Sequence, residues 1–158
     1  MQFDYKNTTI SATTVMPVTT SGYKASRTVF ARLQNATPTE EAETAVRLSW
    51  SNPDSLHHIL VFKNDQAYSY ASNGGNLPSN FTIDVKTVEA YDVPYSRFRY
   101  SGPYKVILYT VNDEYAKILT SNTNTSSQQL NNPPGNIQNG YGIFTAMQAD
   151  TVQLTVNN

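Results

Sequence analysis

Two adjacent histidines are the residues of this chain best suited to chemistry. His57 and His58 closely follow Asp54 and Ser55, so one short segment holds the three residue types of a hydrolytic triad. Neighbouring residues of a strand point to opposite faces, so at most one of these histidines faces a given site. The sequence has no Gly-x-Ser-x-Gly elbow. A hydrolase using His57 or His58 is therefore the weakest hypothesis, and the Asn-Pro-Asp-Ser run is better explained as a turn.

The sequence predicts no catalytic residue, no cofactor and no metal site. It has no cysteine, which excludes thiolate nucleophiles, thiolate zinc ligands and disulfides. Two adjacent histidines are too few for a metal, and the His-Glu-x-x-His spacing is absent. No glycine-rich loop leads from a strand into a helix, as phosphate binding requires. We therefore expect a protein that is not an enzyme.

The charge balance gives little support for nucleic acid or a membrane as a partner. Eleven basic and twelve acidic residues leave a net charge of −1, with no basic tail. No apolar run approaches the ~20 residues that a membrane-spanning helix needs. The first residues also lack the charged and apolar regions of a signal peptide. We expect no nucleic-acid partner and no membrane span, and charge alone leaves open a cytoplasmic or a secreted location.

The dominant periodicity of the chain is two, which indicates strands. Val46, Leu48 and Trp50 alternate with polar residues, and the run 104–111 is the strongest strand pattern. Charged residues make up 15% of the chain, and Asn, Thr, Ser and Tyr, which suit turns and strands, are abundant. The sequence predicts one all-β domain over 1–158, an antiparallel β-sandwich or barrel of jelly-roll-like type.

The predicted elements are short strands and a single helix. A capping residue, a proline and a glutamate begin one short helix near 38–45. The expected strands lie at 3–5, 14–18, 28–33, 46–50, 81–85, 104–111 and 115–119, with hairpins over 58–71 and 143–156. Apolar residues on the inner side of these strands predict the core, which should contain Val46, Leu48, Trp50, Leu60, Phe62, Ile83, Val85, Val106, Leu108, Leu154 and Val156.

An aromatic and arginine-rich stretch at 91–104 is the first candidate partner surface. It holds five aromatic residues and two arginines, types that are enriched at recognition hot spots. An alternative is ordinary strand packing, with Phe98 and Tyr100 inside and both arginines in solvent. The residues assigned to the candidate surface are Tyr95, Arg97, Phe98, Arg99, Tyr100 and Tyr104.

A polar loop over 120–140 is the second candidate surface. Loops of this length inside a compact domain are uncommon and often functional. The segment is dominated by Asn, Ser, Thr and Gln, so we expect it at an exposed tip, where loops carry recognition. Its candidate recognition residues are Asn122, Asn124, Gln128, Asn131 and Asn132.

The stretch 91–104, the loop 120–140 and a final strand that ends at Asn158 together resemble the protruding domain of a small non-enveloped RNA-virus capsid protein. The resemblance implies a location on the virion surface, a homodimer or trimer, and attachment to a host receptor or glycan. The alternative is a monomeric glycan-binding or membrane-active β-sandwich, similar to a lectin or toxin.

Overall fold

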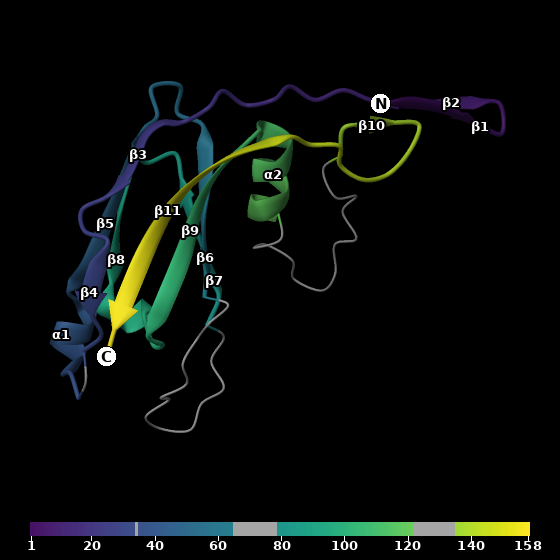
Figure 1. The fold of residues 1–158 in the computed structure, drawn as a ribbon. Coiled ribbons are helices and arrows are strands. Elements are labelled where there is room, and N and C mark those ends of the chain that lie inside the picture. The colour runs from purple at the N-terminus through teal and green to yellow at the C-terminus, as the bar shows by residue number, and fades with distance from the viewer. Residues whose placement is uncertain (34, 65–78, 122–134) are drawn as a thin grey trace.

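The structure is a computed structural model that describes residues 1–33, 35–64, 79–121 and 135–158. These residues form eleven strands, two α-helices and one short 3-10 helix. Two sheets pack face to face as a sandwich, and a third, smaller sheet lies outside it (Figure 1). The predicted all-β sandwich is confirmed.

The larger sheet has five strands and is built around its central strand. The order is β4 (Val29–Ala31), β11 (Met147–Asn157), β9 (Gly102–Val111), β6 (His57–Lys63) and β7 (Phe81–Lys86). Strand β9 pairs with β11 over ten residues and with β6 over seven, both antiparallel. From Lys105 to Val111 it therefore has a paired strand on both sides, which suits the apolar run read from the sequence.

The smaller sheet of the sandwich covers the inner face of the larger one. It consists of β3 (Ser21–Ala25), β5 (Thr44–Ser51) and β8 (Ala90–Pro94), all antiparallel. The residues that alternate inward from both sheets form one buried cluster. All eleven residues predicted for the core lie in this cluster, each less than 9% exposed.

The strand order is of immunoglobulin type rather than jelly-roll type. The segment 21–31 contributes to both sheets of the sandwich. Its strand β3 pairs with β5 in the smaller sheet, and its strand β4 pairs parallel to the last strand, β11, in the larger one. A jelly roll is antiparallel throughout, so the parallel pair distinguishes the two.

The hydroxyl of Tyr104, at the start of β9, donates a hydrogen bond of 3.0 Å to the carbonyl of Tyr100. This contact is the tyrosine corner found in immunoglobulin-type sandwiches.

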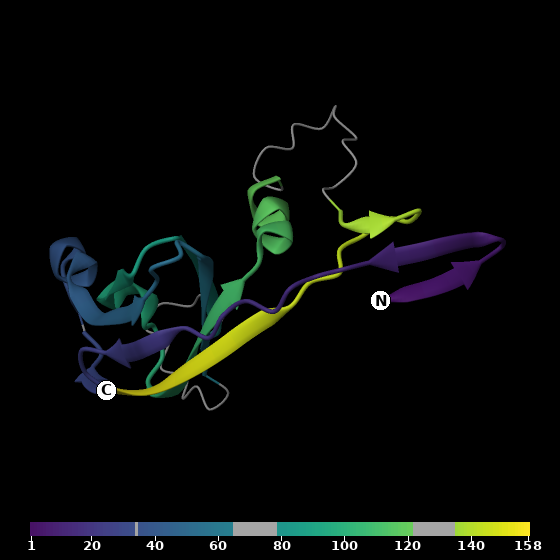
Figure 2. The same ribbon diagram turned by 90° about the horizontal axis from the view of Figure 1, so that it is seen from above.

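The third sheet extends beyond one end of the sandwich. It consists of β1 (Gln2–Tyr5), β2 (Thr8–Ala12) and β10 (Ile137–Gln138), in the order β1-β2-β10, and we call it the arm sheet. Two connections reach it, the segment 13–20 and the chain between β9 and β11. Figure 2 shows that it lies well outside the packed sheets.

One predicted strand is a helix. Residues 115–119 belong to α2 (Asp113–Ser121), not to a strand. The side-chain oxygen of Asn112 accepts a hydrogen bond from the Tyr115 amide at 3.4 Å, and two acidic residues occupy the first turn. Tyr115, Ile118 and Leu119 also have helical spacing. The predicted helix near 38–45 is confirmed as α1 (Pro38–Ala42), with the expected capping box.

The predicted hairpin at the end of the chain is also wrong. Residues 147–157 form one continuous strand because β9 offers a partner along its whole length. The polar residues at 148–150 contain no glycine to turn the chain.

Three other predicted strands differ from the structure. The segment 14–18 forms no strand, and the strand predicted at 28–33 is limited to β4. In the predicted hairpin 58–71, β6 pairs instead with β7, and residues 65–71 lie outside the described ranges.

Truncation of the central strand provides a test of this core. Leu108→Ala should lower the free energy of unfolding by about 2–5 kcal/mol, because it leaves a cavity at a side chain that is 1% exposed. Lys105→Ala on the exposed face of the same strand is the matched control, with an expected change within about 0.5 kcal/mol. Denaturant unfolding of both variants measures the difference. Equal effects would contradict the proposed burial.

Candidate functional site

The two histidines lie on opposite faces of β6, as the sequence predicted. His57 Nε2 lies 2.6 Å from an Asp84 carboxylate oxygen on the neighbouring strand β7, on the outer side of the sheet. His58 points into the sandwich, and its ring lies 5.6 Å from that of Trp50. The turn before them is held by Asn52, whose side chain bonds the Leu56 backbone twice. The two rings therefore do not share a site.

His58 is a buried polar residue at the base of the arm connection. It is 1% exposed, and its Nε2 lies 3.2 Å from the hydroxyl of Thr20. That hydroxyl also contacts the Thr110 hydroxyl at 2.5 Å. The His58 Nδ1 has no hydrogen-bond partner among the described residues. Burial lowers the pKa of His58 below its ordinary value of 6.5, so the neutral ring is favoured.

The aromatic and arginine-rich stretch is only partly a surface. Phe98 and Tyr104 are 1% and 0% exposed and belong to the core, so their assignment to a partner surface is wrong. The reason is the register of the following strand, which turns Tyr104 inward. Tyr95 is half-buried and its hydroxyl accepts a hydrogen bond from Arg27 at 3.1 Å. Its neighbour Arg97 is exposed.

The remaining residues of that stretch can still contact a partner. Arg99 is exposed and Tyr100 is half-buried. A partner role for the exposed arginines and the two half-buried tyrosines stays a prediction. Phe98 lies inside, as the alternative read from the sequence expected, but it follows the 3-10 helix η1 (Tyr95–Arg97) and is not part of a strand. The second candidate surface, with Asn122, Asn124, Gln128, Asn131 and Asn132, lies outside the described residues.

The arm sheet begins with a tight hairpin that the sequence analysis did not identify. Lys6 and Asn7 join β1 to β2, and both have positive φ angles, 46° and 61°. Such angles at both central residues define a type I′ turn, which matches the twist of paired strands. Asn is favoured in this conformation, and it follows an alternating Phe3 and Tyr5. That combination is the signal that predicts the hairpin.

The register of the arm sheet makes it amphipathic. Phe3 pairs with Ile10, and Ile137 pairs with Ala12, so these residues share one face with Tyr5. The other face is polar. There, Thr9 donates a hydrogen bond to Asp4 at 2.7 Å, and Ser11 donates one to Gln138 at 3.1 Å.

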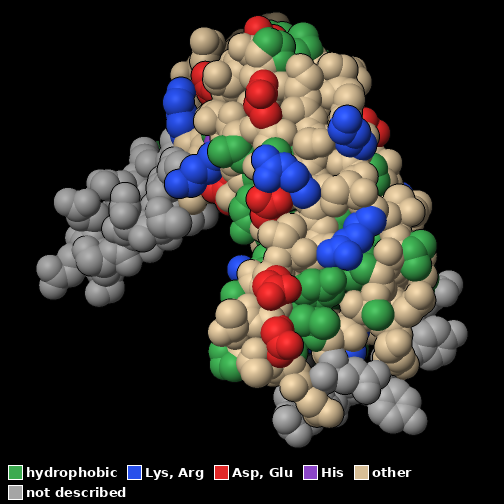
Figure 3. All heavy atoms as spheres, turned by 90° about the vertical axis from the view of Figure 1, so that its left-hand side faces the viewer, with side chains coloured by type: hydrophobic (Ala, Val, Ile, Leu, Met, Phe, Trp, Pro, Cys, Tyr) green, Lys and Arg blue, Asp and Glu red, His purple; other side chains and the backbone are tan. Residues whose placement is uncertain are grey.

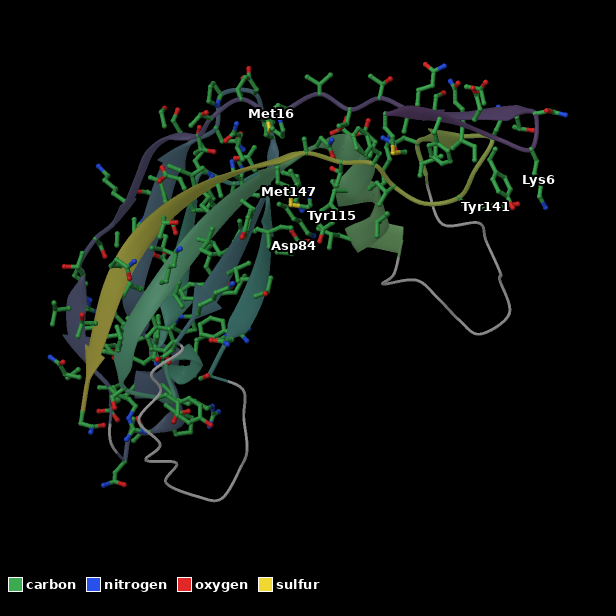
Figure 4. All side chains as sticks on the ribbon, turned by 45° about the vertical axis from the view of Figure 1, so that its right-hand side comes forward. Lys6, Met16, Asp84, Tyr115, Tyr141 and Met147 are labelled. Atoms are coloured by element: carbon green, nitrogen blue, oxygen red, sulfur yellow. The ribbon has the colours of Figure 1, made fainter. Side chains whose placement is uncertain are left out.

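The apolar face is only partly covered. A methyl group added at Gly140 would lie 3.0 Å from Ile137 and 3.5 Å from Ile10, so the chain at 140 covers the inner part of the face. Further out, Phe3 and Tyr5 are 49% and 58% exposed. Figure 4 shows Tyr141 below the hairpin strands and Lys6 at their tip.

Exposed apolar side chains concentrate in and around this sheet. Seven of the ten large hydrophobic residues that are exposed in the described chain lie in residues 1–18 or beside β10. They are Met1, Phe3, Tyr5, Val15, Met16, Val18 and Tyr141. Large apolar residues that are grouped outside the core mark an interaction surface. By contrast, the side of the sandwich in Figure 3 carries basic and acidic side chains intermixed, with no patch of one sign.

Side-chain hydrogen bonds, rather than buried apolar residues, hold the arm sheet in place. The Asn136 amide donates to the carbonyls of Thr13 at 3.2 Å and Phe144 at 2.8 Å. Asn139 donates to the Thr9 carbonyl at 2.9 Å. Of the arm residues at 1–12, only Ala12 is buried. These bonds join the segment around β10 to the N-terminal strands, while the apolar face of the sheet stays open.

The described residues contain neither a cluster of metal ligands nor a membrane-spanning helix. Within the described ranges, no three His, Asp or Glu side chains are grouped as a metal would require. No helix in the same part of the chain is long and apolar enough to cross a membrane.

Comparison with known proteins gave no match: no family model, no curated protein and no solved structure is significantly similar to this chain.

The buried imidazole predicts a specific acid sensitivity. Because the folded state disfavours protonated His58, the unfolded state binds more protons as the pH falls below 6.5. The free energy of unfolding should therefore decline on acidification from neutral pH toward the lowered pKa of His58. In His58→Gln this part of the decline should be absent. Urea unfolding of both proteins between pH 8 and about pH 5 compares the two slopes, and identical slopes would contradict the assignment.

Proposed function

We propose that this protein is a non-catalytic assembly module that associates with copies of itself through the arm sheet. The observation that carries the proposal is the apolar face of that sheet, with Phe3 and Tyr5 about half exposed outside the core of the sandwich. A small sheet with one apolar face gains stability when that face is covered. Covering it with protein removes both aromatic side chains from water.

A second copy of the chain fits this surface by charge. The apolar face carries no carboxylate, and the cations of this hairpin are Lys6 at the turn and the N-terminal ammonium of Met1. The chain as a whole has a net charge of −1, so two copies repel each other only weakly. A strongly charged partner would find no complementary patch on this face.

The narrower form of the proposal is a surface domain of a viral capsid, as the sequence resemblance implies. A projecting sheet with exposed apolar side chains supports it, because capsid surfaces are built from many copies of one chain that contact one another. In that setting the exposed arginines at 97 and 99 are the described residues that would contact a host receptor or glycan. Electron microscopy of the protein as its natural gene expresses it tests this form through the presence of particles.

The assembly role predicts which side chains a dimer needs. Phe3→Ser combined with Tyr5→Ser should weaken self-association at least about tenfold, because two anchoring aromatic rings are lost. Thr9→Ala combined with Ser11→Ala alters the polar face of the same sheet and should leave it unchanged. Sedimentation over a concentration series, on protein without an N-terminal tag, measures both. Far-UV circular dichroism verifies the fold of each variant.

Two outcomes would contradict this assignment. An oligomer that survives the Phe3 and Tyr5 changes but dissociates in Arg97→Ala combined with Tyr100→Ala would place the interface on the aromatic stretch. A parent that stays monomeric at millimolar concentration would refute self-association. Binding assays would then turn to the glycan-binding alternative, for which exposed aromatic rings are the expected platform.

A further inference from the structure

We infer that two copies join edge to edge along β1, antiparallel, with the two Phe3 residues facing each other across a two-fold axis. This inference rests on the proposed function, and it specifies how the second copy binds. It gives a continuous six-stranded sheet with the order β10-β2-β1-β1-β2-β10. Pairing of exposed strand edges is a common mode of protein association.

The hydrogen-bonding pattern of the hairpin determines which backbone groups are free. Met1 and Ala12 exchange two backbone hydrogen bonds, of 2.9 and 3.0 Å. Hydrogen-bonded and non-hydrogen-bonded pairs alternate along an antiparallel ladder, so Phe3 and Tyr5 also bond inward to β2. The N–H and C=O groups of Gln2 and Asp4 therefore point outward along the edge of β1 that no strand of the described residues pairs with.

One register uses all of these outward groups. Placing Phe3 opposite Phe3 of the second copy pairs Gln2 with Asp4 twice, as two hydrogen-bonded pairs. Shifting the strands to place Asp4 opposite Asp4 brings two carboxylates together, which is destabilising. Shifting them the other way, to place Gln2 opposite Gln2, leaves the Asp4 groups unpaired. The register centred on Phe3 is therefore the one that pairs all the outward groups of Gln2 and Asp4 and keeps the two Asp4 carboxylates apart.

The side chains in this register also match. Directly opposed residues share a face, so both Phe3 rings lie on the apolar face at a non-hydrogen-bonded position, where side chains are closest. Tyr5 lies opposite Met1 of the second copy on that same face. The apolar faces of the two arm sheets thereby join into one stripe, in which side chains now about half exposed contact one another and are shielded from water along the shared edge.

The other sheet edges of the described chain that are at least three residues long are less suited to pairing. Strand β7 presents Asp84 and Lys86 to solvent, and β8 ends in Pro94, which has no N–H to donate. The register of β3 is interrupted by an irregularity next to Ser21. Strand β4 is three residues long. The edge of β1 has neither a proline nor an irregularity.

A proline substitution at Asp4 distinguishes edge pairing from other contacts between two copies. Asp4→Pro removes an N–H that points to solvent in the monomer, so the hairpin is retained, but edge pairing loses two hydrogen bonds across the two-fold axis. The dimer should dissociate at least tenfold more readily. Asp4→Ala is the matched control: it keeps the N–H and removes only the side chain, and it should dimerise like the parent. Circular dichroism and sedimentation are measured on all three proteins.

Cysteine cross-linking tests the register itself, because the natural chain has no cysteine. Phe3→Cys should form a covalent dimer on mild oxidation, since opposed residues at a non-hydrogen-bonded position lie close enough for a disulfide. Ile10→Cys occupies the neighbouring strand, three strand spacings or about 14 Å from its counterpart, and should not cross-link.

Each remaining outcome has a definite meaning. A dimer that survives Asp4→Pro, or that cross-links through Ile10→Cys and not Phe3→Cys, would overturn edge pairing and leave the assembly role intact, with the arm sheets stacked face to face. A monomeric parent would overturn both the inference and the proposed function.

Discussion

The antiparallel ladder between β9 and β11 is the interaction on which the rest of the structure depends. It contributes ten residue pairs and places the inward side chains of both strands against the opposite sheet. Strand β4 pairs only with β11, so without the β9–β11 ladder the five-stranded sheet would lose both β11 and its edge strand β4. The ladder also fixes where the chain between β9 and β11 leaves and re-enters the sandwich. The arm sheet takes its third strand from that chain, so its position depends on the same pairing.

The unusual composition of the chain has a structural explanation. Residues such as Asn112, Asn136 and Asn139 use side-chain amides to bond backbone or hydroxyl groups of the N-terminal segment. Threonine hydroxyls at 14 and 20 complete these contacts. Hydrogen bonds of this kind orient a connection without burying apolar residues, and each contributes only about 1 kcal/mol. A chain poor in charge and rich in uncharged polar residues thus holds an extension in position and leaves its apolar face free.

Sequence reasoning succeeded where burial alone determines the structure. The alternation in β5, β7 and the end of β11 identified core residues such as Leu48, Val85 and Leu154 correctly, because a half-buried strand has only one apolar side. It failed at 115–119, where helical capping by Asn112 outweighed a short apolar run. It also placed Phe98 on a surface, since no local pattern reveals which aromatic residues the opposite sheet will cover. The arm sheet joins residues far apart in sequence, and local periodicity cannot show such pairing.

The pairing of β10 with β2 has a consequence for the order of folding. The β1–β2 hairpin is local and closes around a two-residue turn, whereas Ile137 must find Ala12 from the far end of the chain. Contacts so distant in sequence form after local ones, once other pairings have shortened the effective loop. Closure of the β9–β11 ladder is the pairing that brings β10 within reach of the hairpin. A complete arm sheet is therefore a property of chains that have finished folding, and in incompletely folded chains the hairpin that carries the proposed assembly surface lacks its third strand.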